Sequence, residues 1–341
     1  MADLFSTNVL TGVVNSLQTP PSWLLDTFFG GTQTEQSEEI HFDVENDVMG
    51  LAPFVSPYVE GAVVTDQGYV TKTFKPAYIK PKTPWDPAKS LKRQAGEPIG
   101  GNLSPEARMQ AQLNTTLRVH REMIARRLEW MAAQVLLGGS ITVTGDKYPS
   151  TVISYARDAS LTATLAGGAK WSDSGVDALA NLQTWAELMF AKSGSWPVNV
   201  VLDLKAWNLF KSNAAVIARI NLQRAATQAP SLSQNAVTQT GAVRMGDVDG
   251  FNIWVYHGVY KDANGTQQKM LPDYTALMVG DLMGVQAYGA IMDEEAGMQA
   301  LPFFSKSWIT PDPSRRWIMT QSAPLIVPYR PNASLCMTVH S

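Results

Sequence analysis

A single long helix is the feature that most constrains how this chain can fold. Ser104 is a favourable N-cap residue, Pro105 suits the first helical position, and Glu106 lies near the positive end of the helix dipole. Apolar side chains then recur at helical spacing until a pair of glycines ends the pattern. We therefore predict a helix over residues 105–137, about 50 Å long at 1.5 Å per residue and well beyond the usual globular length. The apolar positions are Met109, Leu113, Leu117, Ile124, Leu128, Met131 and Val135.

Charged residues are segregated along the chain. Residues 1–71 contain ten acidic side chains and no Lys or Arg, whereas residues 72–127 contain twelve basic side chains and four acidic ones. The acidic segment is therefore expected to attract the basic one, within one chain or between copies. Over all 341 residues the net charge is −3, which argues against a generally basic nucleic-acid-binding surface.

The composition indicates a folded protein with a neutral surface. Charged residues make up 17 % of the chain, below the typical quarter, and apolar residues make up 45 %, so general disorder is excluded. A neutral surface with ten tryptophans is expected if subunit contacts cover it, because Trp is enriched at interface anchors. A large core is the alternative explanation.

The single cysteine and the hydropathy pattern bear on where the chain is made. Cys336 excludes an intramolecular disulfide framework and suits a reducing compartment, and its apolar surroundings predict a buried structural thiol. No window holds eighteen apolar residues, and the region around Asp3 has no basic signal-peptide segment. We expect a soluble protein, made inside the cell, with no membrane partner.

The first hundred residues predict extensions that cannot form a core alone. Residues 1–39 are polar except for an aromatic knot at Trp23, Phe28 and Phe29, which is either an arm pinned to a neighbouring surface or a docked N-terminal helix. Residues 40–48 alternate with period 2 and predict a strand. Residues 58–82 predict a two-stranded excursion that turns near 66–68 and must lean on another surface. The prolines that follow, at positions 76, 81, 84 and 87, are expected to prevent regular sheet.

Helices and strands alternate after the long helix, so the predicted class is α+β. Asn264-Gly265 is the strongest short hairpin signal in the chain, and we expect 251–260 and 269–279 to be its two strands. The other expected elements are a hairpin over 141–155 turning at Gly145-Asp146, helices over 173–190 and 204–224, strands over 198–202, 318–327 and 335–339, and a loop over 228–240.

Motifs for catalysis, cofactors or metals are absent from the sequence. The four histidines have no His or Cys at metal-ligand spacing, and no phosphate-binding loop or nucleophile elbow occurs. Asp293-Glu294-Glu295 is a carboxylate cluster without partner spacing, so we interpret it as a solvated loop. We expect no catalytic residue, no cofactor and no metal, and hence no enzyme. A hydrolase with dispersed catalytic residues is the alternative.

Several short segments, in order along nearly the whole chain, resemble one known family. The sequence is similar to the major capsid (head) proteins of lambda-like tailed bacteriophages, which have the Hong Kong 97 capsid fold. Residues 1–20, 156–197 and 225–250 lie outside the obvious similarity. The matching segments are Val55-Ser56-Pro57, Tyr78-Ile79-Lys80-Pro81-Lys82, Asp203-Leu204-Lys205-Ala206-Trp207, Leu271-Pro272-Asp273, Tyr288-Gly289-Ala290-Ile291, Trp308 with Thr310, Asp312-Pro313 and Gln321-Ser322-Ala323-Pro324-Leu325.

The resemblance implies a domain organisation and a set of partners. It implies an N-terminal arm (1–40), an extended-loop region (41–100), a peripheral domain (101–170 and 300–341) with a spine helix at about 105–137, and an axial domain (171–299). The implied function is an icosahedral head shell of pentamers and hexamers that encloses packaged double-stranded DNA. Implied partners are copies of the chain itself, a decoration protein at three-fold positions, a portal and a scaffold, with only weak, non-specific contact to the DNA. The implied location is the virion, after assembly in the bacterial host cytoplasm.

Within this interpretation, fifteen residues are expected at contacts between subunits. The aromatic knot should bury against neighbouring copies, and the acidic arm should meet basic groups of the loop or the helix on an adjacent copy. An encapsulin-like compartment and a tail-tube or other virion protein stay open as alternatives. The expected contact residues are Trp23, Phe28, Phe29, Glu35, Glu38, Glu39, Lys72, Lys75, Lys80, Lys82, Arg108, Arg118, Arg121, Arg126 and Arg127.

Overall fold

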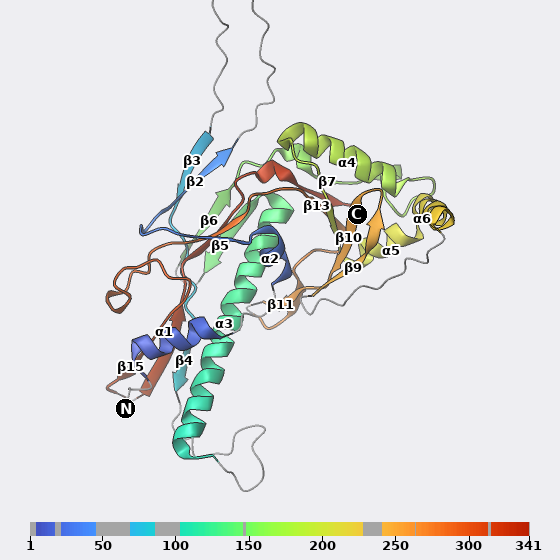
Figure 1. Cartoon of the computed structure of the whole chain (residues 1–341). Coiled ribbons are helices and arrows are strands. Elements are labelled where there is room, and N and C mark those ends of the chain that lie inside the picture. Colours follow the sequence, from blue (N-terminus) through green and yellow to red (C-terminus); the bar gives the residue numbers. More distant parts are fainter. Residues whose placement is uncertain are drawn as a thin grey trace, which may run out of the picture.

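The computed structural model mixes helices and strands along the chain, as the predicted α+β class requires. The long helix α3 (Pro105–Gly138) runs through the middle of the molecule, and the other elements are arranged around it (Figure 1). The structure describes residues 5–17, 22–45, 69–85, 103–145, 148–227, 241–262, 264–312 and 315–340.

Helix α3 confirms the main prediction, including the residues that end it. The Ser104 hydroxyl accepts a hydrogen bond from the Ala107 amide at 3.2 Å, so the predicted N-cap is in place. Gly139 adopts the left-handed conformation with φ 61° at the other end. A side chain there would collide with Arg157, whose guanidinium donates to the carbonyl oxygens of Leu136 and Leu137 at 2.7 and 2.6 Å. Both a glycine and a half-buried arginine therefore terminate the helix.

A six-stranded sheet lies beside α3, with strand order β7-β18-β13-β8-β10-β9. Its central strands are buried on both faces, because alternate residues of one strand enter two different apolar clusters. In β13, Leu277 and Val279 face the cluster that contains α3, while Ala276 and Met278 face the other. The strands are β7 (Thr162–Thr164), β8 (Asn199–Leu202), β9 (Ala242–Val248), β10 (Phe251–Tyr256), β13 (Thr275–Val279) and β18 (Ser334–Thr338).

Helices α4 (Ala178–Ser193) and α5 (Leu204–Ser212) cover the face of this sheet that α3 does not, and α6 (Ala214–Thr227) packs on these two helices. Helix α4 begins five residues later than predicted, because Asp177 is the N-cap and accepts from the Leu179 and Ala180 amides. The predicted helix over 204–224 is confirmed, but it is broken at Asn213 into two helices. These are α5 and α6.

The pairing of β8, β10 and β13 corrects the predicted large hairpin around Asn264-Gly265. Strand β10 pairs with β8 in parallel, and β13 pairs with β8 in antiparallel fashion, so β8 separates the two expected partners. Only β11 (Val259–Lys261) and β12 (Gln267–Lys269) form the local hairpin. Asn264-Gly265 therefore marks a turn, as predicted, between two short neighbouring strands. The longer strands β10 and β13 pair with β8 because their apolar residues are buried there.

The N-terminal segment lies along the body of the molecule instead of projecting from it. Helix α1 (Thr7–Ser16) packs on β15 (Phe304–Thr310) and α3, and the short helix α2 (Trp23–Phe28) packs on α3. Strand β1 (Gly31–Thr34) then pairs in parallel with β14, and β14 pairs with β17. Strand β14 spans Val285–Tyr288, and strand β17 spans Pro324–Val327.

A second three-stranded sheet corrects the expectation that the prolines after residue 75 prevent regular sheet. Strand β4 (Lys82–Trp85) pairs with β16 (Arg315–Gln321), which pairs with β15 (Phe304–Thr310). Pro84 of β4 lies opposite Trp317 of β16. Strand β4 is at the edge of the sheet, where the amide hydrogen that proline lacks is not needed. The predicted single strand over 318–327 is therefore β16 followed by β17 in a different sheet.

Two antiparallel ribbons complete the strands. Strand β2 (Ile40–Glu45) confirms the predicted strand over 40–48, and it pairs with β3 (Tyr69–Phe74). The sequence analysis paired 69–74 with the residues just before the turn at 66–68. That part of the excursion over 58–82 and the turn lie outside the described residues. The expected loop over 228–240 lies outside them too. The hairpin of β5 (Ser140–Gly145) and β6 (Tyr148–Ser154) is confirmed. Short 3₁₀ helices occur at Ala159–Leu161, Gly167–Ala169, Glu294–Ala296 and Pro331–Ala333.

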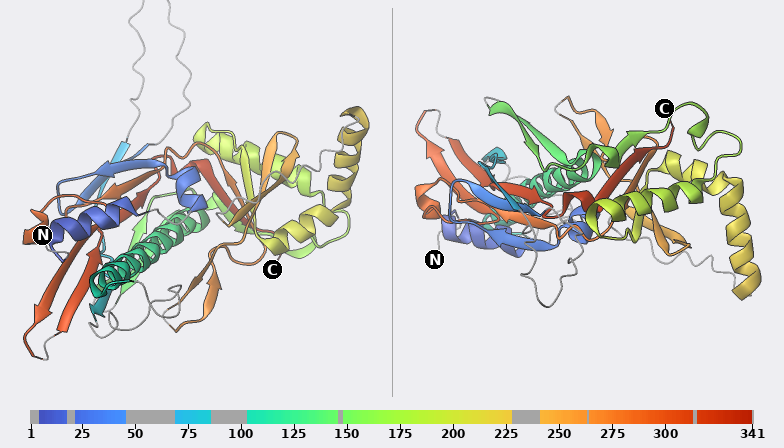
Figure 2. Two further views of the ribbon diagram at one scale, coloured as in Figure 1. Left: turned by 60° about the horizontal axis from the view of Figure 1, so that its bottom comes forward. Right: turned by 90° about the horizontal axis from the view of Figure 1, so that it is seen from above.

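The described part of the molecule is elongated. Helix α1 and the β15–β16 ribbon lie at one end in both views of Figure 2, and α6 stands at the other end. The thiol of Cys336 is buried, as predicted, and lies on β18 in the six-stranded sheet between these ends. Burial raises the pKa of this thiol to about 11.

Candidate functional site

The long helix has one exposed stripe that no other described element covers. Val119 is 41 % exposed and Met123 is 52 % exposed, one helical turn apart. Arg126 and Arg127 are exposed on the following turn, and the Arg127 guanidinium lies 5.1 Å from the centre of the Trp130 ring. We call these residues (119, 123, 126, 127 and 130) the α3 stripe; it combines an apolar centre with a cationic end.

The other three arginines predicted at contacts occupy different environments. Arg118 pairs with Glu122 at 2.7 Å on the surface of α3, and Arg108 is half-buried. Arg121 is only 8 % exposed, and its guanidinium donates to the Val14 carbonyl oxygen of α1. Burial lowers the pKa of Arg121. Arg121 therefore anchors the N-terminal helix of its own chain.

The aromatic knot lies in the core of its own chain. Trp23 packs on Trp254 and Tyr256 of β10, with ring centroids 4.9 and 6.1 Å apart, and Phe28 and Phe29 are at most 8 % exposed. Of the two sequence interpretations, the docked helix describes these contacts. In this conformation the three side chains are covered, so they are not available to a neighbouring copy.

The acidic and basic residues of the first segments meet within one chain. Glu38 forms an ion pair with Lys75, and the Glu35 carboxylate accepts from the His41 amide at 2.9 Å. Both contacts tie the chain before β2 to the ribbon that follows. Glu39 is exposed.

The lysines of the loop region also contact their own chain. The Lys72 ammonium donates to the Ser154 carbonyl oxygen at 2.7 Å. Lys80 lies over the Tyr78 ring at 4.5 Å, and Lys82 lies 3.9 Å from the centre of the Trp317 ring and 4.9 Å from that of Trp308. The two contacts of Lys82 hold β4 against the β15–β16 ribbon.

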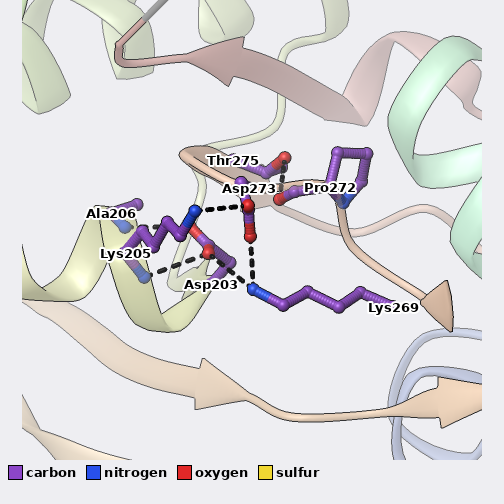
Figure 3. Close-up of polar contacts among 7 residues, drawn as sticks. All are labelled: Asp203, Lys205, Ala206, Lys269, Pro272, Asp273 and Thr275. Carbon is purple, nitrogen blue, oxygen red and sulfur yellow. Dashed lines mark hydrogen bonds and ion pairs between the residues drawn. The ribbon is translucent and has the colours of Figure 1, made fainter. Parts of the chain in front are cut away.

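Two of the sequence motifs meet in one ion-pair cluster at the start of α5 (Figure 3). Asp203, 2 % exposed, caps α5 by accepting from the Lys205 and Ala206 amides at 3.0 and 2.9 Å. The Lys205 ammonium donates to Asp273 at 2.6 Å, and Lys269 pairs with both Asp273 and Asp203. Two cations and two carboxylates balance one another, so the cluster ties α5 to the entrance of β13 and offers no free charge to a substrate.

A second polar network is centred on His120 of α3. The His120 Nε2 atom lies 2.7 Å from Thr83 Oγ1, and its Nδ1 atom lies 3.2 Å from Thr320 Oγ1, which lies 2.8 Å from Ser305 Oγ. Burial lowers the pKa of His120 to about 4, so the ring is neutral at pH 7. A histidine beside hydroxyl groups could in principle form a catalytic site. Here His120, Thr320 and Ser305 are buried, and among the described residues no carboxylate takes part in the network. The network instead joins α3 to β4, β16 and β15.

Glu129 is a buried carboxylate that the sequence analysis did not single out. It is 5 % exposed and accepts hydrogen bonds from the Leu24 and Leu25 amides at 3.0 and 2.9 Å and from the Tyr256 hydroxyl at 2.7 Å. A sequence signal was available. Glu129 follows Ala125 by one turn and precedes Ala132 and Ala133, and such small residues indicate that another element approaches closely.

The described residues contain no cluster suited to a metal and no membrane span. No group of three or more His, Cys, Asp or Glu side chains within them is placed to hold a metal ion. Asp293 of the predicted carboxylate cluster pairs with Lys306 at 2.5 Å. Among these same residues no helix combines the length and apolar character needed to cross a bilayer.

Comparison with known proteins gives matches over almost the whole chain. The family model described as Phage major capsid protein E matches residues 6–339. The major capsid protein of Escherichia phage lambda is 30 % identical over 318 residues, 89 % of each chain. That of Enterobacteria phage P21 is 28 % identical over 333 residues, 95 % of this chain and 96 % of the relative. The crystal structure of a putative capsid protein of an E. coli CFT073 prophage superposes with a TM-score of 0.73 at 22 % identity over 98 % of both chains.

Proposed function

The chain belongs to the Phage major capsid protein E family and is a phage major capsid protein, and from this premise we propose how its parts build the shell. As a capsid protein of this fold it assembles with copies of itself and is a component of the virion. The observation that supports the proposal best is that the similarity, in sequence and in fold, runs the length of the chain.

Electron microscopy of the purified chain tests the function directly. We expect closed shells built of pentamers and hexamers. Tubes or rings would point to a tail protein, and shells that purify with a protein cargo would point to an encapsulin-like compartment. A discrete small oligomer with catalytic turnover would contradict the proposal altogether.

We propose that the described body divides into a peripheral part around α3 and an axial part around the six-stranded sheet. The proposal starts from the sequence boundaries (1–40, 41–100, 101–170 with 300–341, and 171–299). Most residues of the apolar cluster between the six-stranded sheet and helices α4 and α5 come from 171–299, which supports an axial part, although residues of that range also enter the cluster that contains α3. Strands β7 and β18 pair within the six-stranded sheet, so we assign residues 162–164 and 334–338 to the axial part. The axial parts pack around the five-fold and six-fold axes.

We propose that the α3 stripe is a contact with a neighbouring copy. Its cationic end suits an acidic partner segment, and residues 1–71 of the chain contain ten acidic side chains and no basic one. Of the predicted acidic contact residues, Glu39 is exposed, whereas Glu38 already pairs with Lys75 in its own chain. Contact between Glu39 of one copy and the arginines of the next is the simplest pairing.

Charge reversal tests this pairing. Arg126→Glu together with Arg127→Glu should reduce the yield of closed shells about tenfold, because like charges would then face each other across the contact. Adding Glu39→Lys should restore part of the yield, since opposite charges meet again. Glu187→Lys, an exposed reversal on α4, is the matched control and should leave assembly unchanged. Normal shells from the double reversal would refute the proposed contact.

We propose the remaining partners from the family alone: a decoration protein at three-fold positions, a portal and a scaffold. Contact with packaged double-stranded DNA is proposed to be weak and independent of sequence, because a chain with a net charge of −3 offers few excess cations to phosphates. We further propose that the chain catalyses no reaction. The buried titratable groups described above serve packing contacts, and this supports a structural role.

A further inference from the structure

Glu129 joins three parts of the chain that are far apart in sequence. It lies on α3, it binds two amides at the start of α2, and it binds the Tyr256 hydroxyl of β10. The N-cap residue of α2, Ser22, makes no side-chain capping hydrogen bond, so Glu129 performs that role from another helix. Helix α2 is thereby attached to both the long helix and the six-stranded sheet.

The site for α2 is shaped to receive it. Trp23 packs on Trp254 and Tyr256 of β10. Tyr256 itself occupies the space where any side chain at Gly258 would lie, because a Cβ atom there would overlap its ring and hydroxyl. A glycine at 258 therefore lets Tyr256 turn toward Glu129.

The charge of Glu129 opposes this attachment. In the described ranges no basic side chain forms an ion pair with it. The titratable groups that face it are Tyr256 from β10 and Asp26 from α2; on α3 itself, Arg126 and Arg127 lie on the exposed stripe. Burial raises the pKa of Glu129 even though three hydrogen bonds favour the ionised form. An ionised carboxylate buried without a cation is costly.

We propose that Glu129 makes α2 a releasable strap: its hydrogen bonds fix where the strap docks, while its uncompensated charge keeps docking weak enough for α2 to detach without unfolding the rest. The neighbouring elements are fastened independently. Helix α1 is held by the Arg121 contact to Val14, and β1 by its pairing with β14, so detachment is confined to residues 22–28. Detachment removes one link between the long helix and the six-stranded sheet, whereas the direct packing of α3 on β18 is kept.

The pH dependence of docking has a definite sign. The docked state raises the pKa of Glu129 above its ordinary value, so docking is strongest below that ordinary value. Between the ordinary and the raised value the docked state holds a proton that the detached state does not. Docking therefore weakens as pH rises through this window, up to about tenfold per pH unit for one proton.

Hydrogen exchange of the full chain, corrected for intrinsic rates, tests the proposal. The amides of residues 23–28 should be less protected than those of β8 and β13, and their protection should fall as pH is raised from 5 to 8. Glu129→Gln should abolish that pH dependence, because the variant has no carboxyl to titrate. Glu129→Leu should reduce protection of α2 about tenfold or more at every pH, because three buried donors lose their acceptor. Glu122→Gln, on the exposed side of α3, should behave as the unchanged chain.

Two outcomes would overturn the proposal. One is α2 protection equal to that of the central strands and independent of pH, and the other is an undiminished pH dependence in Glu129→Gln. If a Glu129 variant fails to fold, the unaltered chain decides alone. The comparison is then between the pH dependence of amide protection in α2 and that in β8. The inference concerns the single chain, so it stands or fails separately from the proposed subunit contacts.

Discussion

At the scale of single residues, the described structure buries polar side chains along one helix and joins each to another part of the chain. His120, Arg121 and Glu129 all lie on α3, and each contacts a different element. Their burial means that the helix is positioned by hydrogen bonds as well as by apolar packing. Replacing one partner leaves the other unsatisfied, which costs about 1–3 kcal/mol for a neutral group.

His120 gives a prediction with a definite pH window. Its folded pKa, about 4, lies below the ordinary 6.5, so only the unfolded chain takes up this proton between those values. The contribution of His120 to stability is complete above pH 6.5 and is lost as pH falls toward 4, by about 3 kcal/mol in all. His120→Gln should flatten this part of the stability profile, as measured by urea unfolding of the dissociated chain between pH 7 and 4.5.

The control for this measurement is His257→Gln, because His257 is exposed. It should reproduce the profile of the unaltered chain. An identical slope in the His120 and His257 variants would contradict the role of the buried ring.

At the scale of elements, the starts of helices are fixed by side-chain caps more than by surface ion pairs. The cluster at α5 contains both kinds of contact, since Asp203 is buried and Lys205 is half-exposed. Exposed ion pairs contribute little, because water screens them and the long side chains lose freedom. A cap that satisfies two amide groups contributes more.

Substitutions in this cluster should separate the two contributions. Asp203→Ala should lower the free energy of unfolding by about 1–2 kcal/mol, since two amides at the start of α5 lose their acceptor. Lys205→Ala should lower it by clearly less. Chemical denaturation of both variants under the same conditions makes the comparison, and a larger loss from Lys205→Ala would contradict this account.

Elements whose ends are marked locally could be predicted from the sequence, and long-range pairings could not. Helix α3 was predicted almost to the residue because Ser104 and the glycines after residue 137 act through neighbours in the chain. The pairing of β10 and β13 with β8 was missed because it depends on which apolar faces bury together. Strand β4 was missed because Pro84 is tolerated only where the strand lies at an edge.

The candidate site shows the same division. The motifs at 203–207 and 271–273 were recognised separately, but their meeting through Lys205 and Asp273 is a property of the folded chain. The aromatic knot was identified by composition, yet its partners in β10 lie more than two hundred residues away. The role of Glu129 required both the fold and its burial.

At the scale of the whole molecule, the chain leaves apolar side chains exposed at several places. Met123 on α3, Trp196 after α4 and Ile217 on α6 are each at least 45 % exposed. Trp196 stacks on Phe251 and contacts Phe190, so it is held in position instead of being mobile. Side chains of this kind are expected where copies of a capsid protein cover one another.

Assembly should therefore raise the apparent stability of the chain by mass action. At a concentration about a hundred times the dissociation constant of the contacts, the gain is about 2.7 kcal/mol, which corresponds to roughly 4 °C in Tm for a chain of this size. Scanning calorimetry of shells and of dissociated chains measures the difference. Met123→Glu should leave the Tm of the dissociated chain within about 2 °C and reduce the gain on assembly, because an exposed residue contributes little to the isolated fold. Equal Tm values for shells and dissociated chains would contradict the argument.

The place of β18 in the sheet has a consequence for how the protein is made. The strand lies between β7 and β13, yet the ribosome delivers residues 334–338 after every other strand of the described chain. Until then β13 has an unpaired edge, and the apolar residues that β18 covers stay exposed to water. A nascent chain therefore holds the sheet unfinished until residues 334–338 have emerged from the ribosome, and its unpaired edge is prone to aggregation until then.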